Sequence, residues 1–416
     1  MKSIQVIRRL AFNDWGGTET VVWNSARGLR QKGHAAEIVA TAALDRPGKE
    51  KIEDIDIARF KYFYPLWGLR AENRLELDRK GGNPYSWELY HYLKTKKEAA
   101  IFHCHAMHRL ANLTRLAARK LDIPYIISFH GESFDISESE LLELLRPLRH
   151  TVNYGRVLDW ALGDSRFITD ADGIVCTGYD EYLSALRRFP GKMIEFLPNG
   201  VDIDKFSAAP SRDFREVYGI PADRMLLLCV SRIDYQKNQR ILIEMLRRLL
   251  ARHENPHLVL IGPVTSPQYC EQLWRDIAEF ELNDRVTLIR GLNVGDPMLT
   301  AAYKAADYFI LPSIHEPFGI VVLEAWAAGV PVICSGAGGL KRLVAEGGTG
   351  LFFNDFSVED LVNKFYILKS NPELRRCIVE NAGEEVRKKY SWDIINQHLL
   401  EFYEDIIMTY RLKKGR

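Results

Sequence analysis

The segment 313–339, SIHEPFGIVVLEAWAAGVPVICSGAGG, contains two glutamates eight positions apart, Glu316 and Glu324, and ends in a glycine-rich run. A short apolar stretch before it is typical of a buried strand, and Ile320–Ala328 is typical of a helix. Gly319 stands just before that helix, whose first N–H groups lack helical partners and attract anions. The segment therefore predicts a site for an anionic, hydroxyl-bearing ligand between the end of a strand and the start of a helix.

The length and composition indicate a soluble globular protein with more than one domain. The chain has 416 residues, of which 47% are hydrophobic and 27% are charged, and a single ordinary domain is shorter. A formal net charge of +1 argues against a nucleic-acid partner held by bulk charge. The six cysteines are scattered without a CxxC pair, which is typical of core residues in a reducing compartment.

The sequence predicts neither export nor membrane insertion. The apolar run near the N-terminus is too short for a signal peptide. No apolar run reaches the roughly 18–20 residues that are needed to cross a bilayer. We therefore expect a cytoplasmic protein.

Two series of alternating strands and helices predict an α/β fold with parallel sheets. In the first series we expect strands over 3–10, 36–40, 100–105, 125–129, 171–177 and 194–197, with helices over 20–32 and 110–121. In the second series we expect strands over 225–230, 257–261, 286–289, 308–311, 330–334 and 351–353. The helices of this half are expected over 239–253, 269–280, 299–305, 320–328, 358–369, 372–390 and 392–410.

The structure breakers Pro198, Asn199 and Gly200 mark the boundary between the two series. We predict an N-terminal domain over residues 1–197, a linker over 198–206 and a C-terminal domain over 207–391. Ligands of parallel α/β sheets bind beyond the carboxyl ends of the strands. We therefore expect the ligand to lie in a cleft between the two domains.

Four loops follow predicted strands and could meet at that edge. They are Gly16-Gly17, His130-Gly131, Arg232–Lys237 and Glu316–Glu324. Arg232 and Lys237 together suit a diphosphate, although two solvated surface charges are the alternative. Each glutamate can accept hydrogen bonds from two adjacent hydroxyls. A hydrolase-type pair of carboxylates fits less well, because a hydrolase does not need cations for a diphosphate.

The glycine pair and the histidines have simpler alternatives. Gly16-Gly17 is either a flexible turn or a place where a ligand approaches the backbone, and without a GxGxxG pattern it does not predict a dinucleotide site. His103 and His105 are expected to be hydrogen-bonded core residues. His130 stands beside Gly131 and is expected to face a ligand. No further residue at a ligand-like spacing completes a metal site with the histidines.

The segment 316–325 resembles the EX7E motif of the retaining glycosyltransferases of family 4, which have the GT-B fold: two Rossmann-like βαβ domains facing each other across a cleft. Further similarities follow in the order of the family, at Gly16-Gly17-Thr18-Glu19, Pro198-Asn199-Gly200-Val201-Asp202, Ser231-Arg232 with Lys237-Asn238, Gly338-Gly339 and Tyr390-Ser391-Trp392. The last resembles the point where a final helix, here about 392–412, returns to the N-terminal domain. The resemblance covers nearly the whole chain.

The resemblance implies which residues form the site. The catalytic residues would be His130, Glu316, Arg232 and Lys237. The donor-binding residues would be Gly16, Gly17, Arg290, Phe318, Gly319, Ile320, Val321 and Glu324. The chain departs from the family at Lys341-Arg342, where many members have an acid.

In this scheme Glu316 contacts hydroxyls of the donor sugar and Glu324 binds the ribose. Arg232 and Lys237 neutralise the leaving diphosphate, and His130 faces the sugar near the reacting carbon. The expected reaction is the transfer of a hexosyl unit from a UDP- or GDP-sugar with retention of configuration. No cofactor and no metal are expected, because there is no DxD-like pair and the two cations serve the diphosphate.

Other functions are open on the same fold. They are a sugar-nucleotide epimerase, a phosphorylase with a lysine-bound pyridoxal phosphate, and a sugar-nucleotide-binding protein without activity. An epimerase would turn over the donor alone, whereas a pure binding protein would not turn it over at all.

The acceptor is expected to be a glycan, a lipid-linked intermediate of cell-envelope polysaccharide synthesis or a small-molecule hydroxyl compound. Residues 45–95, predicted as variable strands and loops, and 133–165 would shape its pocket. Residues 141–161 predict a long, partly basic helix. A solvated face is the default for such a helix, and peripheral contact with anionic lipids of the inner membrane, on its cytoplasmic face, is the alternative.

Overall fold

A computed structural model describes residues 1–130, 146–149, 151–163, 166–292, 295–354 and 356–415. The chain divides into two compact units. Unit 1 contains Met1–Pro198 and Trp392–Arg416, and unit 2 contains Asn199–Ser391. Each unit has a parallel sheet covered by helices, so the predicted α/β class with two Rossmann-like domains is confirmed.

Unit 1 is built on an eight-stranded sheet with the order β10-β9-β7-β6-β1-β2-β4-β3. Its strands are β1 (Lys2–Arg9), β2 (Ala35–Thr41), β3 (Gly48–Ile52), β4 (Ile55–Phe60), β6 (Ile101–Cys104), β7 (Tyr125–Phe129), β9 (Gly173–Cys176) and β10 (Met193–Phe196). Their pairing is parallel except that β3 runs antiparallel to β4 at the edge. The loops that follow β1, β6 and β7 therefore leave the sheet at one edge.

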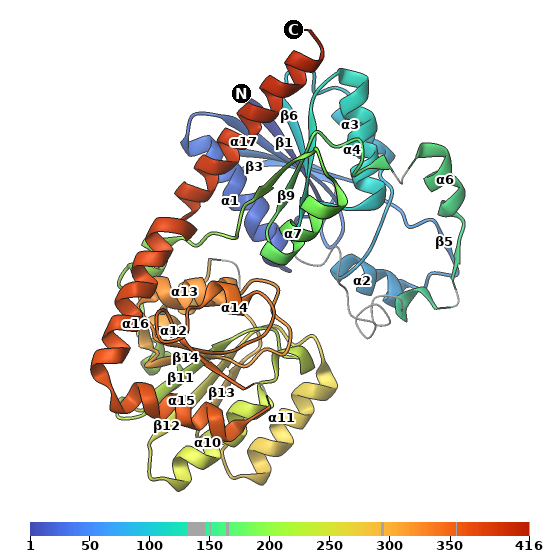
Figure 1. The fold of residues 1–416 in the computed structure, drawn as a ribbon. Coiled ribbons are helices and arrows are strands. Elements are labelled where there is room, and N and C mark those ends of the chain that lie inside the picture. Colours follow the sequence, from blue (N-terminus) through green and yellow to red (C-terminus); the bar gives the residue numbers. More distant parts are fainter. Residues whose placement is uncertain (131–145, 150, 164–165, 293–294, 355, 416) are drawn as a thin grey trace. The chain divides into compact units, whose positions relative to one another are not determined.

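Helices cover both faces of this sheet (Figure 1). The helices α1 (Gly17–Gln31) and α17 (Trp392–Lys413) pack on one face, and α3 (Trp87–Leu93), α4 (His108–Leu121) and α7 (Tyr179–Arg188) pack on the other. Because both faces are buried, the central strands are apolar along most of their length. Gln5 and His103 are exceptions, and both contact the hydroxyl of Tyr403 on α17.

Unit 1 differs from the sequence prediction in two stretches. Residues 45–95 contain the helices α2 (Ala71–Arg79) and α3 besides the strands β3, β4 and β5 (Leu66–Trp67). The single long helix expected over 141–161 is wrong in the described residues, which form the 3-10 turn η1 (Arg146–Leu148), β8 (Val152–Asn153) and α6 (Gly155–Leu162). The chain is extended at β8 because that strand pairs with β5, a long-range contact that local periodicity cannot reveal. Residues 131–145, with Gly131, lie outside the described residues, as do residues 150 and 164–165.

Unit 2 is built on a six-stranded parallel sheet with the order β13-β12-β11-β14-β15-β16. Its strands are β11 (Met225–Val230), β12 (Pro256–Ile261), β13 (Val286–Ile289), β14 (Tyr308–Leu311), β15 (Val332–Ser335) and β16 (Leu351–Phe353). One face is covered by α8 (Ile203–Ser207), α9 (Phe214–Tyr218), α12 (Pro297–Ala305), α13 (Ile320–Ala328) and α16 (Pro372–Glu385). The other is covered by α10 (Arg240–Ala251), α11 (Pro267–Glu279) and α15 (Val358–Ser370).

The segment between the two sheets is not separate from unit 2. Residues 198–206, predicted as a linker, include most of α8, and Phe206 of α8 is buried in the core beside α12 and α13. After the π-helical turn η4 (Val386–Tyr390), the chain enters α17, which packs on α1 in unit 1. No helix in the described ranges is long and apolar enough to cross a membrane.

Candidate functional site

Two loops meet at the carboxyl edge of the sheet in unit 2 because β11 and β14 are direct neighbours. The loop after β11 contains Arg232 and Lys237, and the loop after β14 contains Glu316. The backbone N–H of Ile314 donates a hydrogen bond of 2.7 Å to the carbonyl of Gln236, which ties the two loops together. The structure thus brings three of the predicted site residues to one place, although they lie far apart in the chain.

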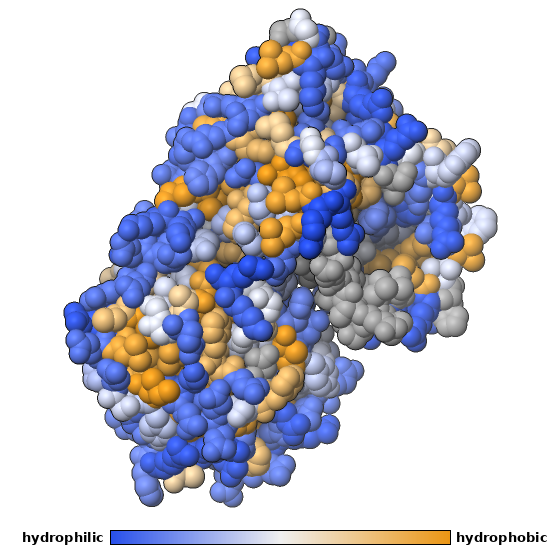
Figure 2. Space-filling view, viewed as in Figure 1, coloured by the Kyte–Doolittle hydropathy of each residue, from blue (hydrophilic) through white to orange (hydrophobic). Residues whose placement is uncertain are grey.

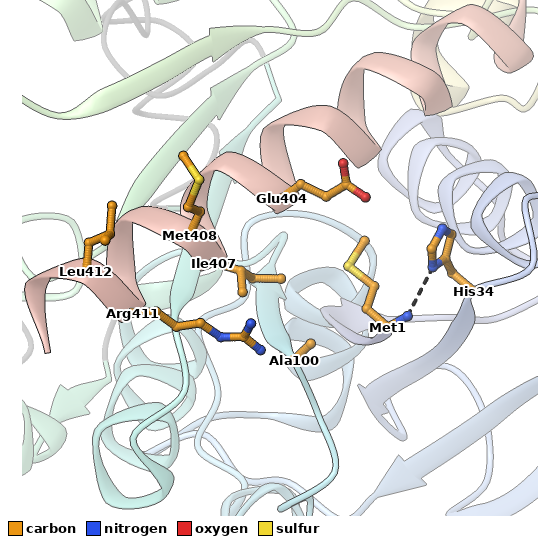
Figure 3. Close-up of a pocket in the computed structure, with 8 residues that line it drawn as sticks. All are labelled: Met1, His34, Ala100, Glu404, Ile407, Met408, Arg411 and Leu412. Carbon is orange, nitrogen blue, oxygen red and sulfur yellow. Dashed lines mark hydrogen bonds between the residues drawn. The ribbon is translucent and has the colours of Figure 1, made fainter. Parts of the chain in front are cut away.

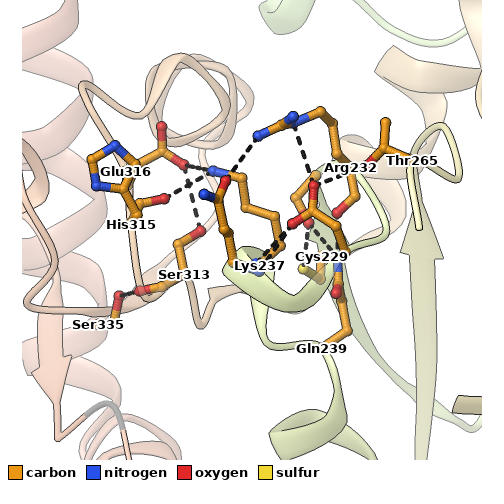
Figure 4. A network of polar contacts seen from close by, with 12 residues as sticks. Cys229, Arg232, Lys237, Gln239, Thr265, Ser313, His315, Glu316 and Ser335 are labelled. Atoms are coloured by element: carbon orange, nitrogen blue, oxygen red, sulfur yellow. Dashed lines mark hydrogen bonds and ion pairs between the residues drawn. The ribbon is translucent and has the colours of Figure 1, made fainter. Parts of the chain in front are cut away.

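Lys237 and Glu316 form an ion pair that joins the loops after β11 and β14 (Figure 4). The Nζ of Lys237 lies 2.9 Å from Oε2 of Glu316 and also donates to the carbonyl of His315 at 3.1 Å. The side chains are 9% and 14% exposed. Ser313 Oγ lies 3.4 Å from the same carboxylate oxygen. The ammonium group is therefore fixed by its partners before any ligand arrives.

Arg232 is held in a more open position. Its guanidinium donates to Oε1 of Gln236 at 3.3 Å and lies 3.6 Å from Oδ2 of Asp234, while its side chain stays 37% exposed. Asp234 also accepts from the backbone N–H groups of Gln236 and Lys237, so it shapes the turn that carries both cations. This arrangement offers one anchored and one accessible positive charge to an anion.

The glycine-rich run packs against the turn that carries Glu316. A Cβ added at Gly338, where φ is +48°, would lie 2.5 Å from the carbonyl oxygen of Glu316. A Cβ at Gly339 would lie 2.2 Å from the carbonyl oxygen of Pro317, and the N–H of Gly339 donates to the carbonyl of Glu316 at 2.9 Å. These glycines serve close backbone packing, which sets the position of the acidic turn.

The helix α13 begins directly after this turn. Gly319 precedes it in the left-handed region with φ +97°, a conformation that favours glycine. The N–H groups of Ile320 and Val321 are the first of a helix, where anions are stabilised by the unpaired donors and the helix dipole. Phe318 packs edge-on against Tyr390, with ring centroids 6.1 Å apart. The predicted backbone site thus lies beside the ion pair of Lys237 and Glu316.

Glu324 lies about one turn further along α13 than Ile320. Its Oε2 accepts a hydrogen bond of 2.8 Å from the hydroxyl of Tyr303, which is fully buried on α12. Burial raises the pKa of Glu324 to about 7, against the opposing effects of the Tyr303 hydrogen bond and the positive charge of Lys205. The carboxyl group is therefore half-buried, oriented and close to its titration point at neutral pH.

Arg290 and Lys341-Arg342 are less closely tied to this group. Arg290 is exposed directly after β13, which β12 separates from β11. Lys341 and Arg342 lie in the short helix α14 (Leu340–Leu343), and both are exposed. Arg290 thus lies at the same carboxyl edge as the ion pair, two strands away from the loop of Arg232.

In unit 1 the loop after β1 contains Gly16 and Gly17, which begin α1. Arg9 at the end of β1 is buried and pairs with Glu19 at 2.9 Å and with Asp14 at 2.7 Å. A Cβ added at Gly16 would lie 2.9 Å from Oε2 of Glu19. The ion pairs of Arg9 thus define the shape of the glycine loop, and Gly17 is exposed at the start of the helix.

His130 follows β7 at the same carboxyl edge of unit 1 and is half-buried. Its Nε2 lies 3.2 Å from Nδ1 of His105, so the histidine expected to face a ligand is in contact with one expected in the core. His103 and His105 are buried and hydrogen-bonded, as predicted. Burial lowers the pKa of His130 to about 4. Among the residues that the structure describes, no group of three or more His, Cys, Asp or Glu side chains is arranged to hold a metal ion.

A pocket of about 440 Å³ lies elsewhere in unit 1 (Figure 3). Its lining includes Met1, His34 and Ala100, which directly precede β1, β2 and β6. It therefore opens at the amino edge of the parallel sheet, opposite to the edge that holds the predicted site residues. Because the pocket lies at the opposite edge of the sheet from the predicted site residues, we assign it no role in the site.

None of the residues that hold the site in shape was predicted as a site residue, although Glu19 and Gly338 stand in segments that resemble the family. These supporting residues are Asp234, Gln236, Tyr303, Ser313 and Gly338 in unit 2, and Gln5, Arg9 and Glu19 in unit 1. Asp234 had a usable signal, because aspartate is one of the residues preferred at the N-cap of a helical turn. Gln236 and Ser313 contact nearby residues of their own loops, Arg232 and Glu316, whereas Tyr303 and Gln5 act through contacts between distant segments that sequence spacing does not reveal.

The comparisons with known proteins find glycosyltransferases over both halves of the chain. Residues 15–205 match the family model described as Glycosyltransferase Family 4, and residues 210–385 match the model described as Glycosyl transferases group 1. An uncharacterized glycosyltransferase of Methanocaldococcus jannaschii is 26% identical over 392 residues, which cover 91% of this chain and 92% of that protein. The D-inositol 3-phosphate glycosyltransferase of Corynebacterium glutamicum is 30% identical, but the match covers only 59% of this chain and 60% of that enzyme.

Solved structures support the fold. Anabaena HepE in complex with UDP superposes with a TM-score of 0.71 at 19% identity, covering 97% of this chain and 100% of that one. WaaG, described as a glycosyltransferase involved in lipopolysaccharide biosynthesis, has a TM-score of 0.65 at 17% identity and covers 96% and 98% of the two chains. At these identities the likeness concerns the architecture of the chain.

Proposed function

The chain belongs to the glycosyltransferases of family 4, and we propose that it transfers a hexosyl unit from a nucleoside diphosphate sugar to a hydroxyl group with retention at the anomeric carbon. The observation that carries this proposal is the pair of Lys237 and Glu316 beside the start of α13. A cation held in place, a carboxylate and the first N–H groups of a helix, all at the carboxyl edge of one sheet, suit a sugar diphosphate.

The leaving diphosphate accumulates negative charge as the glycosidic bond breaks. Lys237 and Arg232 stabilise that charge, together with the N–H groups of residues 319–321 at the start of α13. Because these groups are already oriented, they need little rearrangement in the transition state. They also remove the need for a divalent metal ion, and we propose a reaction without metal or other cofactor.

The remaining predicted residues complete the contacts with the donor. Glu316 accepts hydrogen bonds from the hexose and Glu324 accepts them from the ribose, each from a pair of adjacent hydroxyls. Gly16 and Gly17 let the diphosphate approach the backbone of unit 1, and His130 contacts the hexose near its reacting carbon. Arg290 supplies a further donor contact from the end of β13.

Two observations support the proposed acceptor: the description of one structural neighbour, and the exposed surface around β5 and α6. WaaG takes part in lipopolysaccharide biosynthesis by its description, so we propose a glycan or lipid-linked acceptor of the cell envelope. Trp67, Val157 and Trp160 are 69%, 70% and 85% exposed around β5 and α6. Figure 2 shows apolar surface among hydrophilic residues over these elements. Arg149 and Arg156 are exposed in the same region, and this combination suits an anionic membrane surface.

One experiment tests the donor and the class of activity together. UDP-, GDP- and ADP-sugars are first screened by thermal shift, since a ligand at about 100 times its Kd stabilises a protein by about 2.7 kcal/mol. The stabilising donor is then incubated with and without lipid-linked and free-glycan acceptors, and products are identified by mass spectrometry and by NMR of the anomeric proton. We expect acceptor-dependent transfer with retained configuration. Epimerised donor formed without an acceptor, or binding without any turnover, would refute the proposal in favour of the epimerase or the non-enzymatic binding protein.

A further inference from the structure

Inside unit 1 a series of hydrogen-bonded polar side chains leads from His130 to Tyr403 of the C-terminal helix α17 and from there to Ser128. Its members in order are His130, His105, Gln5, Tyr403, His103 and Ser128. All except His130 are fully or almost fully buried. The proposed reaction uses only His130, and we call the whole set the histidine chain.

The directions of these hydrogen bonds follow from chemistry. The Nε2 of His105 lies 2.8 Å from Oε1 of Gln5, which can only accept, so His105 has its proton on Nε2. The amide nitrogen of Gln5 donates to the hydroxyl of Tyr403 at 2.9 Å and to the hydroxyl of Ser3 at 3.2 Å, so the amide oxygen Oε1 faces His105. Burial keeps the pKa of His105 well below its usual range, so its Nδ1 carries no proton.

The same reasoning assigns the protons of His130 and His103, toward the two ends of the histidine chain. The bare Nδ1 of His105 must accept from Nε2 of His130, 3.2 Å away, so the neutral ring of His130 has its proton on Nε2. At the other end the hydroxyl of Tyr403 donates to Nδ1 of His103 at 2.6 Å, and Nε2 of His103 donates to Ser128 at 2.6 Å. One assignment of protons thus accounts for the five hydrogen bonds that join the members of the histidine chain.

We propose that His105 is a positioning residue for glycosyl transfer: held by Gln5, it fixes His130 in the tautomer whose Nε2 is protonated and whose Nδ1 is an acceptor. His130 therefore receives a hydrogen bond from a donor-sugar hydroxyl at Nδ1 and cannot donate one from that nitrogen. Helix α17 takes part in this positioning through Tyr403, whose hydroxyl accepts a hydrogen bond from the amide of Gln5. The proposal rests on the function proposed above for His130.

The first test needs neither substrate nor turnover. In the whole protein labelled with ¹⁵N-histidine, long-range ¹H–¹⁵N spectra should show His130 with a protonated Nε2. The Gln5→Glu variant should reverse this tautomer, because a carboxylate beside Nε2 of His105 favours imidazolium, whose Nδ1–H then donates to His130. Ser128→Ala removes only the far end of the histidine chain and should leave the His130 signals unchanged. A protonated Nδ1 in the wild type, or signals that Gln5→Glu does not change, would overturn the proposal.

The second test links the tautomer to the reaction. His105→Leu should lower kcat about tenfold, the effect of one lost hydrogen bond, with an unchanged KM for the acceptor. His105→Asn keeps a side-chain oxygen that accepts from His130 and should recover most of the rate. Equal losses in both variants, or no loss in either, would overturn the positioning role. Failure of the proposed function itself would be seen separately, as a wild-type protein that transfers sugar from no nucleotide donor.

Discussion

The Nζ of Lys237 lies 2.9 Å from Oε2 of Glu316, although 79 positions of the chain separate the two residues. Their contact follows from the sheet order, which places β11 beside β14 and brings the ends of both strands together. Around this pair, α13 supplies its N–H groups and the glycines after β15 hold the acidic turn. The testable consequences concern this group and its immediate support.

Replacing Lys237 by alanine should lower kcat by about 10²–10³-fold, as expected when one preorganised donor to a developing charge is removed. The fall should be much smaller for Lys237→Arg, which keeps the charge. Steady-state kinetics with saturating donor measures both. Lys388→Ala, at an exposed position of the same unit, is the matched control and should leave kcat unchanged. An unchanged kcat in Lys237→Ala would show that this lysine does not serve the leaving group.

Donor binding should weaken as the pH falls through 7, because burial raises the pKa of Glu324 to about 7 and the carboxylate is the form that accepts two ribose hydroxyls. Below that pH the Kd should rise by up to about tenfold per unit. Titration calorimetry with a nucleoside diphosphate sugar between pH 5.5 and 8.5 measures this. Glu324→Gln should bind weakly and without that pH dependence.

The same shift affects stability with a defined sign. The folded state holds the Glu324 proton more tightly than the unfolded chain, whose pKa is near the ordinary value of 4.5. The stabilising contribution of Glu324 is therefore complete below about 4.5 and is lost as the pH rises through 7. Glu324→Gln should accordingly raise the Tm at pH 8 relative to the wild type, and by more than it does at pH 5. A Tm difference that is the same at both pH values would contradict the raised pKa.

Tyr303→Phe removes the hydroxyl that donates to Glu324. We expect the KM for the donor to rise about fivefold to tenfold with little change in kcat, because ribose binding is the same in ground and transition states. The pH midpoint of donor binding should also move upward, since this hydrogen bond lowers the pKa of Glu324. Tyr308→Phe is a matched control: Tyr308 is buried in the same unit, and its hydroxyl accepts from Arg375. If both variants had the same kinetics, Tyr303 would have only a structural role.

Gly338→Ala should displace the turn that carries Glu316, because the new Cβ would meet its carbonyl oxygen at 2.5 Å. Both the Tm and kcat/KM should fall. Gly347→Ala is the control, since Gly347 also has a positive φ, +70°, but has open space around a Cβ. It should lose about 1 kcal/mol of stability from the backbone conformation alone and keep its activity. Equal activity of the two variants would mean that the glycine packing does not position Glu316.

Removal of divalent metals should leave the rate unchanged. Arg232 and Lys237 provide the positive charge that a metal would otherwise supply to the diphosphate. Initial rates are compared after dialysis against EDTA and after addition of Mg²⁺ or Mn²⁺. Activity that disappears with EDTA and returns with either metal would refute a metal-independent reaction.

The sequence by itself determined the class of the fold and the elements of unit 2. The strand Tyr308–Leu311 and the helix Ile320–Ala328 were predicted at their observed bounds, because buried parallel strands and helices between glycines have strong local signals. The resemblance of residues 316–325 named the candidate residues and the family, while their catalytic roles remain predictions.

Only the tertiary structure decided how those residues are held. The contacts of Lys237 with Glu316, of Tyr303 with Glu324 and of His105 with His130 join segments whose distance along the chain gives no sign of their proximity. The extended strand β8 in the predicted long helix has the same origin, since pairing with β5 overrides local periodicity. Hydrogen bonds, burial and pKa depend on which side chains surround a group, and that neighbourhood exists only once the sheets have ordered their strands.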